Sequence, residues 1–317
     1  MRALFPAQIG SQLGERLRRR WADYGFMAVF LILVLIAAAS ADVFFTQRNI
    51  TNLFRQIVTN GLISLGMLVV ILTGGIDLSV GAIVALCAVL VSGLQRQVSL
   101  PLAVLIALVA GGLVGAVNGF LIARFKLAPF VVTLATMGAV RGMVYVYSEV
   151  PQTSPAAFRT LFGGSIGPVP VAAIIMLACF PLVWLFLNRI TAGRAIVAIG
   201  GNEEAVRLAG ISVSTHLLLA YIISGLLSAM AGILLAARLG IAQPSVGAGY
   251  ELDSIAACVI GGAILGGGGG GAVGTFGGVL TLGLIDNLLN LFNVQSYYQQ
   301  IFKGLIIIFA VLARRKE

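Results

Sequence analysis

The chain has 317 residues, of which 59% are hydrophobic and only 10% are charged. A soluble domain carries roughly 25% charged residues, so the apolar stretches that recur from Phe26 to Leu312 exclude a soluble protein with one core. The formal net charge of +9 is spread over flanks and loops. No folded basic face is indicated, which argues against a nucleic-acid-binding protein.

The apolar stretches predict transmembrane helices, because lipid cannot satisfy an open sheet edge and the alternation of a barrel strand is absent. A span needs about 20 helical residues. On that basis the chain is an all-α, polytopic membrane protein with one transmembrane domain, 26–313, between a basic N-terminal segment, 1–25, and a tail, 314–317. The ten predicted spans are 26–44, 52–73, 78–95, 100–123, 128–147, 170–187, 216–237, 253–266, 271–291 and 296–313.

The basic residues predict the orientation of these spans. Ten spans place both basic ends on one side, and that side holds thirteen of the 20 Lys and Arg residues. Because cytoplasmic loops are rich in Lys and Arg, both termini are expected to be cytoplasmic. The same side then contains the loop 188–215.

The stretch LTGGIDLSVGAIVAL, residues 72–86, places a carboxylate inside an apolar run. Gly74 and Gly75 permit backbone angles that end a helix, and Asp77 can accept hydrogen bonds from N–H groups at the start of the next one. Two readings stay open: Asp77 only caps an interfacial helix, or the broken helix lines a translocation path. On the second reading the path is lined by small and polar residues of this region, Gly74, Gly75, Asp77, Ser79 and Asn118.

A faint internal repeat joins two glycine-rich segments. GGLVGAVNGFL at 111–121 and GGAVGTFGGVL at 270–280 are identical at six of eleven positions. They fall in the fourth and ninth predicted spans, which run in opposite directions. This spacing suggests five plus five helices related by inversion, a common plan among transporters.

The loop 188–215 contains GGN followed by EEAVRLAG. Asn202 can cap a short helix whose first turn holds two glutamates, and Gly210 can stop it. Such a helix is either a connector along the membrane or a coupling helix that docks on a cytoplasmic partner. In the second case the contact residues are Gly193, Arg194, Gly201, Asn202, Glu203, Glu204, Arg207 and Gly210.

Three motifs in this order, GGIDLSVG, GGNEEAVRLAGI and YELDSIAACVIGG, resemble the permease subunits of bacterial monosaccharide ABC importers, the ribose type most closely. The resemblance extends from about Phe44 to Leu312 and includes AGILLAARLGIAQPSVGAGYELD at 231–253. It implies an inner-membrane location, a second permease copy as a homodimer partner, a separate ATP-binding subunit and a periplasmic sugar-binding protein. The chain itself should bind no cofactor; its run GGGGGG at 266–271 lacks the lysine of a phosphate-binding loop.

The last three spans carry further charged residues. Tyr250, Glu251 and Asp253 are candidates for an outer mouth that meets the binding protein or the sugar, and Asp253 is expected to cap the helix that follows it. Asp286 and Lys303 lie at similar depth on spans joined by the loop 292–295. A structural ion pair is therefore expected, because an unpaired charge inside a membrane is costly.

Other classes of protein fit the sequence less well. An ion-coupled secondary transporter or a channel for a small polar solute needs buried carboxylates, for which Asp77 and Asp286 are the candidates. It would leave the loop 188–215 without a role. No H-E-x-x-H or G-x-S-x-G motif points to catalysis, and His216, the only histidine, cannot build a metal site by itself.

Overall fold

The computed structural model describes Met27 and residues 30–314. The predicted N-terminal segment 1–25 and the tail residues 315–317 lie outside the described residues. The described chain is helical except for two pairs of two-residue strands, β1 with β4 and β2 with β3, both antiparallel. After a helix at Phe30–Ser40, the elements are α2 (Gln47–Ile71), α3 (Val80–Leu94), α4 (Leu100–Phe125), α5 (Pro129–Tyr147), β1 (Gln152–Thr153), α6 (Ala156–Gly163), β2 (Ser165–Ile166), β3 (Val169–Pro170), α7 (Val171–Arg189), α8 (Thr191–Gly201), α9 (Glu203–Leu208), α10 (Val213–Leu239), β4 (Ile241–Ala242), α11 (Tyr250–Ile260), α12 (Ala272–Leu291) and α13 (Ser296–Arg314).

Within the described residues, six helices are long and apolar enough to cross a membrane: α2, α4, α5, α7, α10 and α12. An all-α polytopic membrane protein is thereby confirmed, but ten full spans are not. Each remaining predicted span meets a helix, yet α3 has 15 residues and α11 only 11. At 1.5 Å per residue α11 extends for about 16 Å, roughly half of a hydrocarbon core. The predicted span 253–266 is wrong at its end, because Gly262 has a φ of +104° and the helix stops at Ile260.

Helices α2, α3 and α10 form the centre of the molecule. Thirteen of the 15 residues of α3 are buried, and the apolar windows of α2 and α10 are 78% and 61% buried. The corresponding windows of α4 and α5 are only 22% buried. Since lipid is as apolar as a core, the exposed leucines and valines of α4 and α5 fit a surface that faces lipid.

Glycines bring the backbones of neighbouring helices together. Along α4, a Cβ at Gly111 would lie 2.8 Å from the carbonyl oxygen of Gly225 in α10, and Gly115 and Gly119 meet the same helix. In α12, Gly274 and Gly278 press in the same way on the backbone of α11. Small residues at every fourth position allow such close approach in membranes. The two segments of the predicted repeat therefore make the same kind of contact.

The helix contacts correspond under a shift of five predicted spans. Helix α10, the seventh predicted span, packs against α3 and α4, the third and fourth spans. Helix α2, the second span, packs against α11 and α12, the eighth and ninth spans. Likewise α3 contacts α5, and α11 contacts α13. An inverted repeat of five helices requires that contacts between helices of one half recur between the corresponding helices of the other half. The packing therefore supports the repeat that the glycine motifs suggested.

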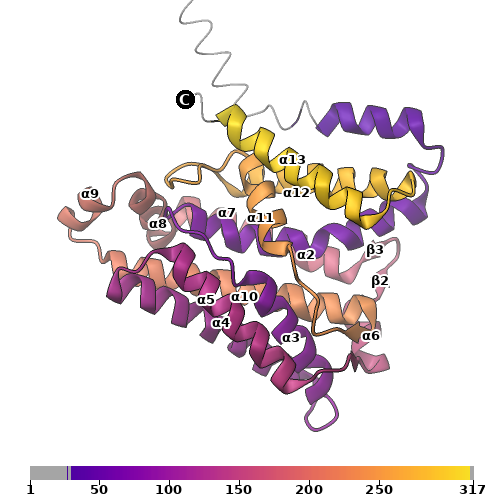
Figure 1. Cartoon of the computed structure of the whole chain (residues 1–317), viewed down its shortest axis with the longest axis horizontal. Coiled ribbons are helices and arrows are strands. Elements are labelled where there is room, and N and C mark those ends of the chain that lie inside the picture. The colour runs from indigo at the N-terminus through magenta and orange to yellow at the C-terminus, as the bar shows by residue number, and fades with distance from the viewer. Residues whose placement is uncertain (1–26, 28–29, 315–317) are drawn as a thin grey trace, which may run out of the picture.

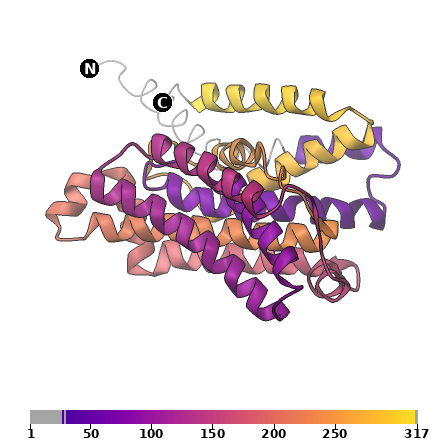
Figure 2. The ribbon, with the colours of Figure 1, turned by 60° about the horizontal axis from the view of Figure 1, so that its bottom comes forward.

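The long helices run side by side, and the connecting segments gather at two opposite ends (Figures 1 and 2). Helices α8 and α9 lie at one end, and α6 with β2 and β3 at the other. Helix α13 extends along the outside, above α12 in both views. The α8–α9 segment and the α6 segment therefore lie at opposite ends of the helical body.

Candidate functional site

The chain breaks sharply between α2 and α3. Gly74 has a φ of +84°, a conformation that strongly favours glycine, and thus ends the helix as predicted. Gly75 has an ordinary φ, so the expectation that both glycines are needed for backbone freedom is wrong for this residue. Its small size matters instead, because a Cβ at Gly75 would lie 2.5 Å from the hydroxyl oxygen of the buried Tyr221.

Asp77 is the centre of a buried polar network just before α3. Its Oδ1 accepts hydrogen bonds from the backbone N–H of Ser79 at 3.0 Å and from the Ser79 hydroxyl at 2.6 Å. Its Oδ2 accepts from the hydroxyl of Ser224 in α10 at 2.8 Å, and Asn118 Nδ2 of α4 donates to Ser79 Oγ at 2.9 Å. All four side chains are fully buried. The network therefore joins the start of α3 to α4 and α10.

Asp77 thus binds the N–H of Ser79, within the predicted stretch 78–80, but Ser79 itself precedes α3, so the carboxylate holds the turn before the helix and does not cap the helix. In a single protomer the carboxylate lies in the interior and borders no solvent. Its partner Ser224 is 147 positions away along the chain, and nothing near Ser224 in the sequence marks it as polar lining. Only the packing of α3 against α10 brings the two together.

At the α8–α9 end, the predicted short helix is present as α9. Asn202 Oδ1 accepts from the N–H of Ala205 at 2.9 Å, and Gly210 follows the helix with a φ of +79°. Arg207 pairs with Glu203 at 2.6 Å and with Glu204 at 3.2 Å, and all three side chains are at least half exposed. Of the eight candidate coupling residues seven are exposed, whereas Gly193 is buried against the carbonyl of Phe186 at the end of α7.

A second helix, α8, lies in this loop and was not predicted separately. Its Gly200 meets two other backbones: an added Cβ would overlap the carbonyl oxygen of Leu72 and lie 2.5 Å from the nitrogen of Gly268. The N–H of Gly268 in turn donates to Leu72 O at 3.0 Å. Gly267, with a φ of +95°, lies against both Gly200 and Gly74. We call this contact of α8, the end of α2 and the run 266–271 the glycine junction.

The opposite end holds a cluster of three charged side chains. Lys303 Nζ of α13 lies 3.0 Å from Asp253 Oδ2 of α11 and 3.1 Å from Asp286 Oδ2 of α12. The three side chains are only 15–21% exposed. The structure brings the predicted pair Asp286 and Lys303 together and adds Asp253, so one ammonium group bridges two carboxylates on separate helices.

The three candidate residues of the outer mouth separate in the structure. Asp253 does not cap α11: the helix begins three residues earlier, at Tyr250, and the carboxylate is held by Lys303. Glu251 Oε1 instead accepts from the N–H of Gly249 at 3.2 Å. Tyr250 and Asp253 face one cavity, and Glu251 is not among its lining residues. The expected cap by Asp253 is therefore wrong, and α11 begins after Gly249 without a side-chain cap.

The cavity has a volume of about 220 Å³, and all ten residues that line it are polar. Four are charged: Arg238, Asp253, Asp286 and Lys303. The other six are Gln56, Thr59, Asn60, Tyr250, Asn290 and Gln299. They come from α2, α10, α11, α12 and α13. Only 10% of the residues in the chain are charged, so four charged residues among the ten of this wall distinguish it from a surface that faces lipid.

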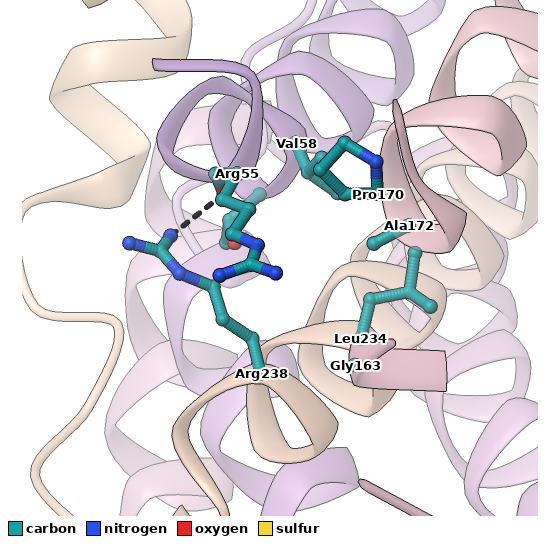
Figure 3. Close-up of a pocket in the computed structure, with 8 residues that line it drawn as sticks. Arg55, Val58, Gly163, Pro170, Ala172, Leu234 and Arg238 are labelled. Atoms are coloured by element: carbon teal, nitrogen blue, oxygen red, sulfur yellow. Dashed lines mark hydrogen bonds between the residues drawn. The ribbon is translucent and has the colours of Figure 1, made fainter. Parts of the chain in front are cut away.

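The side chain of Arg238, which lines this cavity, is held by a hydrogen bond to the backbone of α2. Its Nη1 donates to the carbonyl oxygen of Arg55 at 2.7 Å, across the gap between α10 and α2 (Figure 3). The two arginine side chains lie next to each other and line a second, much smaller cavity. Its other lining residues are Val58, Thr59, Gly163, Pro170, Ala172 and Leu234. Arg238 and Thr59 line both cavities and therefore form part of the wall between them.

Removing the central ammonium of the charged cluster should destabilise the protein more than removing one carboxylate. Lys303→Met leaves Asp253 and Asp286 unpaired and partly buried, which costs about 3 kcal/mol. Asp286→Asn keeps the pair of Lys303 with Asp253 and should cost about 1 kcal/mol. Thermal unfolding of the purified chain in detergent measures both, with Lys126→Met at an exposed position as the control. Equal melting temperatures for the two variants would contradict this ranking.

The fold is that of a polytopic helical membrane protein, and comparison with known proteins specifies its class. The family of permease components of the branched-chain amino acid transport system matches residues 49–311. The ribose import permease protein of Bacillus subtilis is 44% identical over 297 residues, 92% of each chain. That of Escherichia coli K12 is 42% identical, over 92% of this chain and 93% of its own. The L-arabinose transport system permease protein of the same organism is 38% identical, over 94% and 92%.

No solved structure matches the chain. The family match and the relatives extend over nearly the whole membrane domain. The chain therefore belongs to this family of transport-system permeases.

Proposed function

We propose that the chain is the membrane-spanning permease subunit of an ATP-binding-cassette importer for a monosaccharide, ribose or a related sugar. The observation that carries the sugar class is the similarity over nine tenths of the chain to permeases named for ribose and arabinose. The family description names branched-chain amino acids. Leucine would need an apolar site, whereas the 220 Å³ cavity is lined by polar residues.

The two ends of the molecule support the assignment of partners. The α8–α9 segment offers exposed charged side chains to a cytoplasmic ATP-binding subunit. The α6 end would then meet the periplasmic sugar-binding protein, and a second copy of the permease would complete the translocation path. This orientation places both termini in the cytoplasm of a bacterial cell and the helices in its inner membrane. ATP is bound by the partner subunit.

The glycine junction supports a route for coupling. A displacement of α8 by the ATPase reaches Leu72 and Gly74 directly, because Gly200, Gly267 and Gly268 have no side chains between the three backbones. The break at 72–79 is in turn tied to α4 and α10 by the Asp77 network. In this mechanism Gly74, Gly75, Asp77, Ser79 and Asn118 act as the pivot of the broken span, and the sugar passes elsewhere.

An ion-coupled transporter fits these contacts less well. It needs a carboxylate that is free to take up and release an ion, and the two candidates are Asp77 and Asp286. Asp77 accepts three hydrogen bonds within the protomer, and Asp286 is paired with Lys303. Uptake by proteoliposomes that depends on ATP and is blocked by vanadate would support the importer, whereas uptake driven by an ion gradient alone would refute it.

The docking role of α9 is tested by charge reversal. Glu204→Arg places a second cation beside Arg207 on the exposed surface, and we expect at least tenfold less ATPase to co-purify with the permease. Surface ion pairs contribute only about 0–1 kcal/mol, so the helix itself should persist. The control is Glu149→Arg, an exposed glutamate before β1 near the opposite end. Normal co-purification and uptake in Glu204→Arg would exclude docking at α9.

A further inference from the structure

The polar cavity at the α6 end carries no net charge. Arg238 and Lys303 contribute two positive charges, and Asp253 and Asp286 contribute two negative ones. Lys303 is already shared by both carboxylates, at 3.0 and 3.1 Å. A site for a lone cation or anion would present an excess of the opposite charge. The balance of charges therefore favours a neutral ligand.

Two acceptors at this cavity have no hydrogen-bond donor within the described residues. They are Gln56 Oε1, on α2, and Asp286 Oδ1, on α12, and both atoms are buried. A buried acceptor without a donor is costly, and native structures leave few of them. The two residues line the cavity from different helices, and their oxygens, which have almost no accessible surface here, can accept from a ligand hydroxyl group once the side chains turn toward the cavity.

The remaining wall is suited to the same kind of ligand. Asn60 and Thr59 of α2 face amide side chains of α12 and α13, and Gln299 Nε2 donates to Asn290 Oδ1 at 2.9 Å. Amides and hydroxyls both donate and accept, as sugar hydroxyls do. The side chain of a branched-chain amino acid would find apolar partners only in the ring of Tyr250 and the aliphatic parts of polar side chains.

We propose that this cavity within the protomer binds one neutral polyhydroxyl molecule, a monosaccharide, before it enters the translocation path. The sugar class rests on the proposed function, whereas the site itself rests on the cavity, its polar lining residues and its charge balance. The ammonium of Lys303 holds the two carboxylates in position for hydroxyl groups. Arg238, fixed by the carbonyl of Arg55, closes the wall toward α10.

Ligand-observed saturation-transfer NMR tests the site on the full chain in nanodiscs without a binding protein, with D-ribose as the probe. We expect D-ribose to bind in the millimolar range and L-leucine to give no signal. Asn60→Leu replaces a lining amide of α2 with a larger apolar side chain and should weaken D-ribose binding at least tenfold. Asn52→Leu, the same change two turns earlier at an exposed position of α2 outside the cavity, should leave binding unchanged.

Gln299→Ala removes a lining amide without adding a larger side chain, and it should also weaken binding. This variant still tests the site if Asn60→Leu does not fold. Binding that is equal in the wild type, Asn60→Leu and Gln299→Ala overturns the site, as does stronger binding of L-leucine than of D-ribose. If D-ribose does not bind but ATP-driven ribose uptake persists, the cavity proposal fails and the proposed function stands. If D-ribose binds but no ATP-driven uptake occurs, the importer assignment fails and the site stands.

Discussion

Alanine in place of Gly200 is expected to lower ATP-driven uptake at least tenfold while the permease still reaches the membrane. The added methyl group would overlap the carbonyl oxygen of Leu72 and approach the nitrogen of Gly268 to 2.5 Å. Both neighbours are backbone atoms, so no rotamer change can relieve the contact, and α8 must move away from the end of α2. The glycine junction would then no longer pass the motion of the ATPase to the break at 72–79.

Uptake and ATP hydrolysis are measured together in proteoliposomes that contain the assembled complex. Hydrolysis that continues without uptake would show that the contact between α8 and α2 is lost while the ATPase remains bound. Gly138→Ala is the matched control, because a Cβ at Gly138 in α5 meets no atom within 4 Å. Normal coupled uptake in Gly200→Ala would exclude the junction as the route of coupling.

Leucine in place of Asp77 is the second change with a large expected effect. It leaves three donors without an acceptor, the N–H and hydroxyl of Ser79 and the hydroxyl of Ser224. At about 0.6–1 kcal/mol for each hydrogen bond in a membrane protein, the loss is about 2 kcal/mol. Asp77→Asn should keep most transport, because its oxygen can still accept from Ser79 and the Ser224 hydroxyl can turn to accept from its amide.

Gly75→Val should be more damaging than either, since its Cβ would meet Tyr221 at 2.5 Å and Val70 at 3.2 Å. Thermal unfolding and uptake are measured for all three variants, with Asp42→Leu at an exposed position as the control. Asparagine as damaging as leucine would show that the negative charge itself is needed. An undiminished melting temperature in Asp77→Leu would remove the role of the network as a pivot.

The sequence by itself determined the class of fold and the ends of several helices. Its apolar segments of about 20 residues must be helical, because in lipid only a helix satisfies the backbone hydrogen bonds of such a segment. Gly74, Asn202 and Gly210 were recognised because the end of a helix depends on the backbone angles and side-chain hydrogen bonds of the residues at that end. The pairing of Asp286 with Lys303 was also within reach, because one short loop fixes their relative depth.

Only the tertiary structure decided which distant residues meet. Ser224 joins Asp77, and Asp253 joins Lys303, across separations of 147 and 50 positions. Neither contact leaves a periodic or local pattern in the chain. The glycine run 266–271 shows the same limit: its composition permits close approach of backbones, but the packing of α8 against α2 determines which backbone it approaches. Hydrophobic pattern and helix capping depend on residues that are close in the sequence. The polar cavity, by contrast, forms where five separate helices meet, and the glycine junction forms where three separate segments meet.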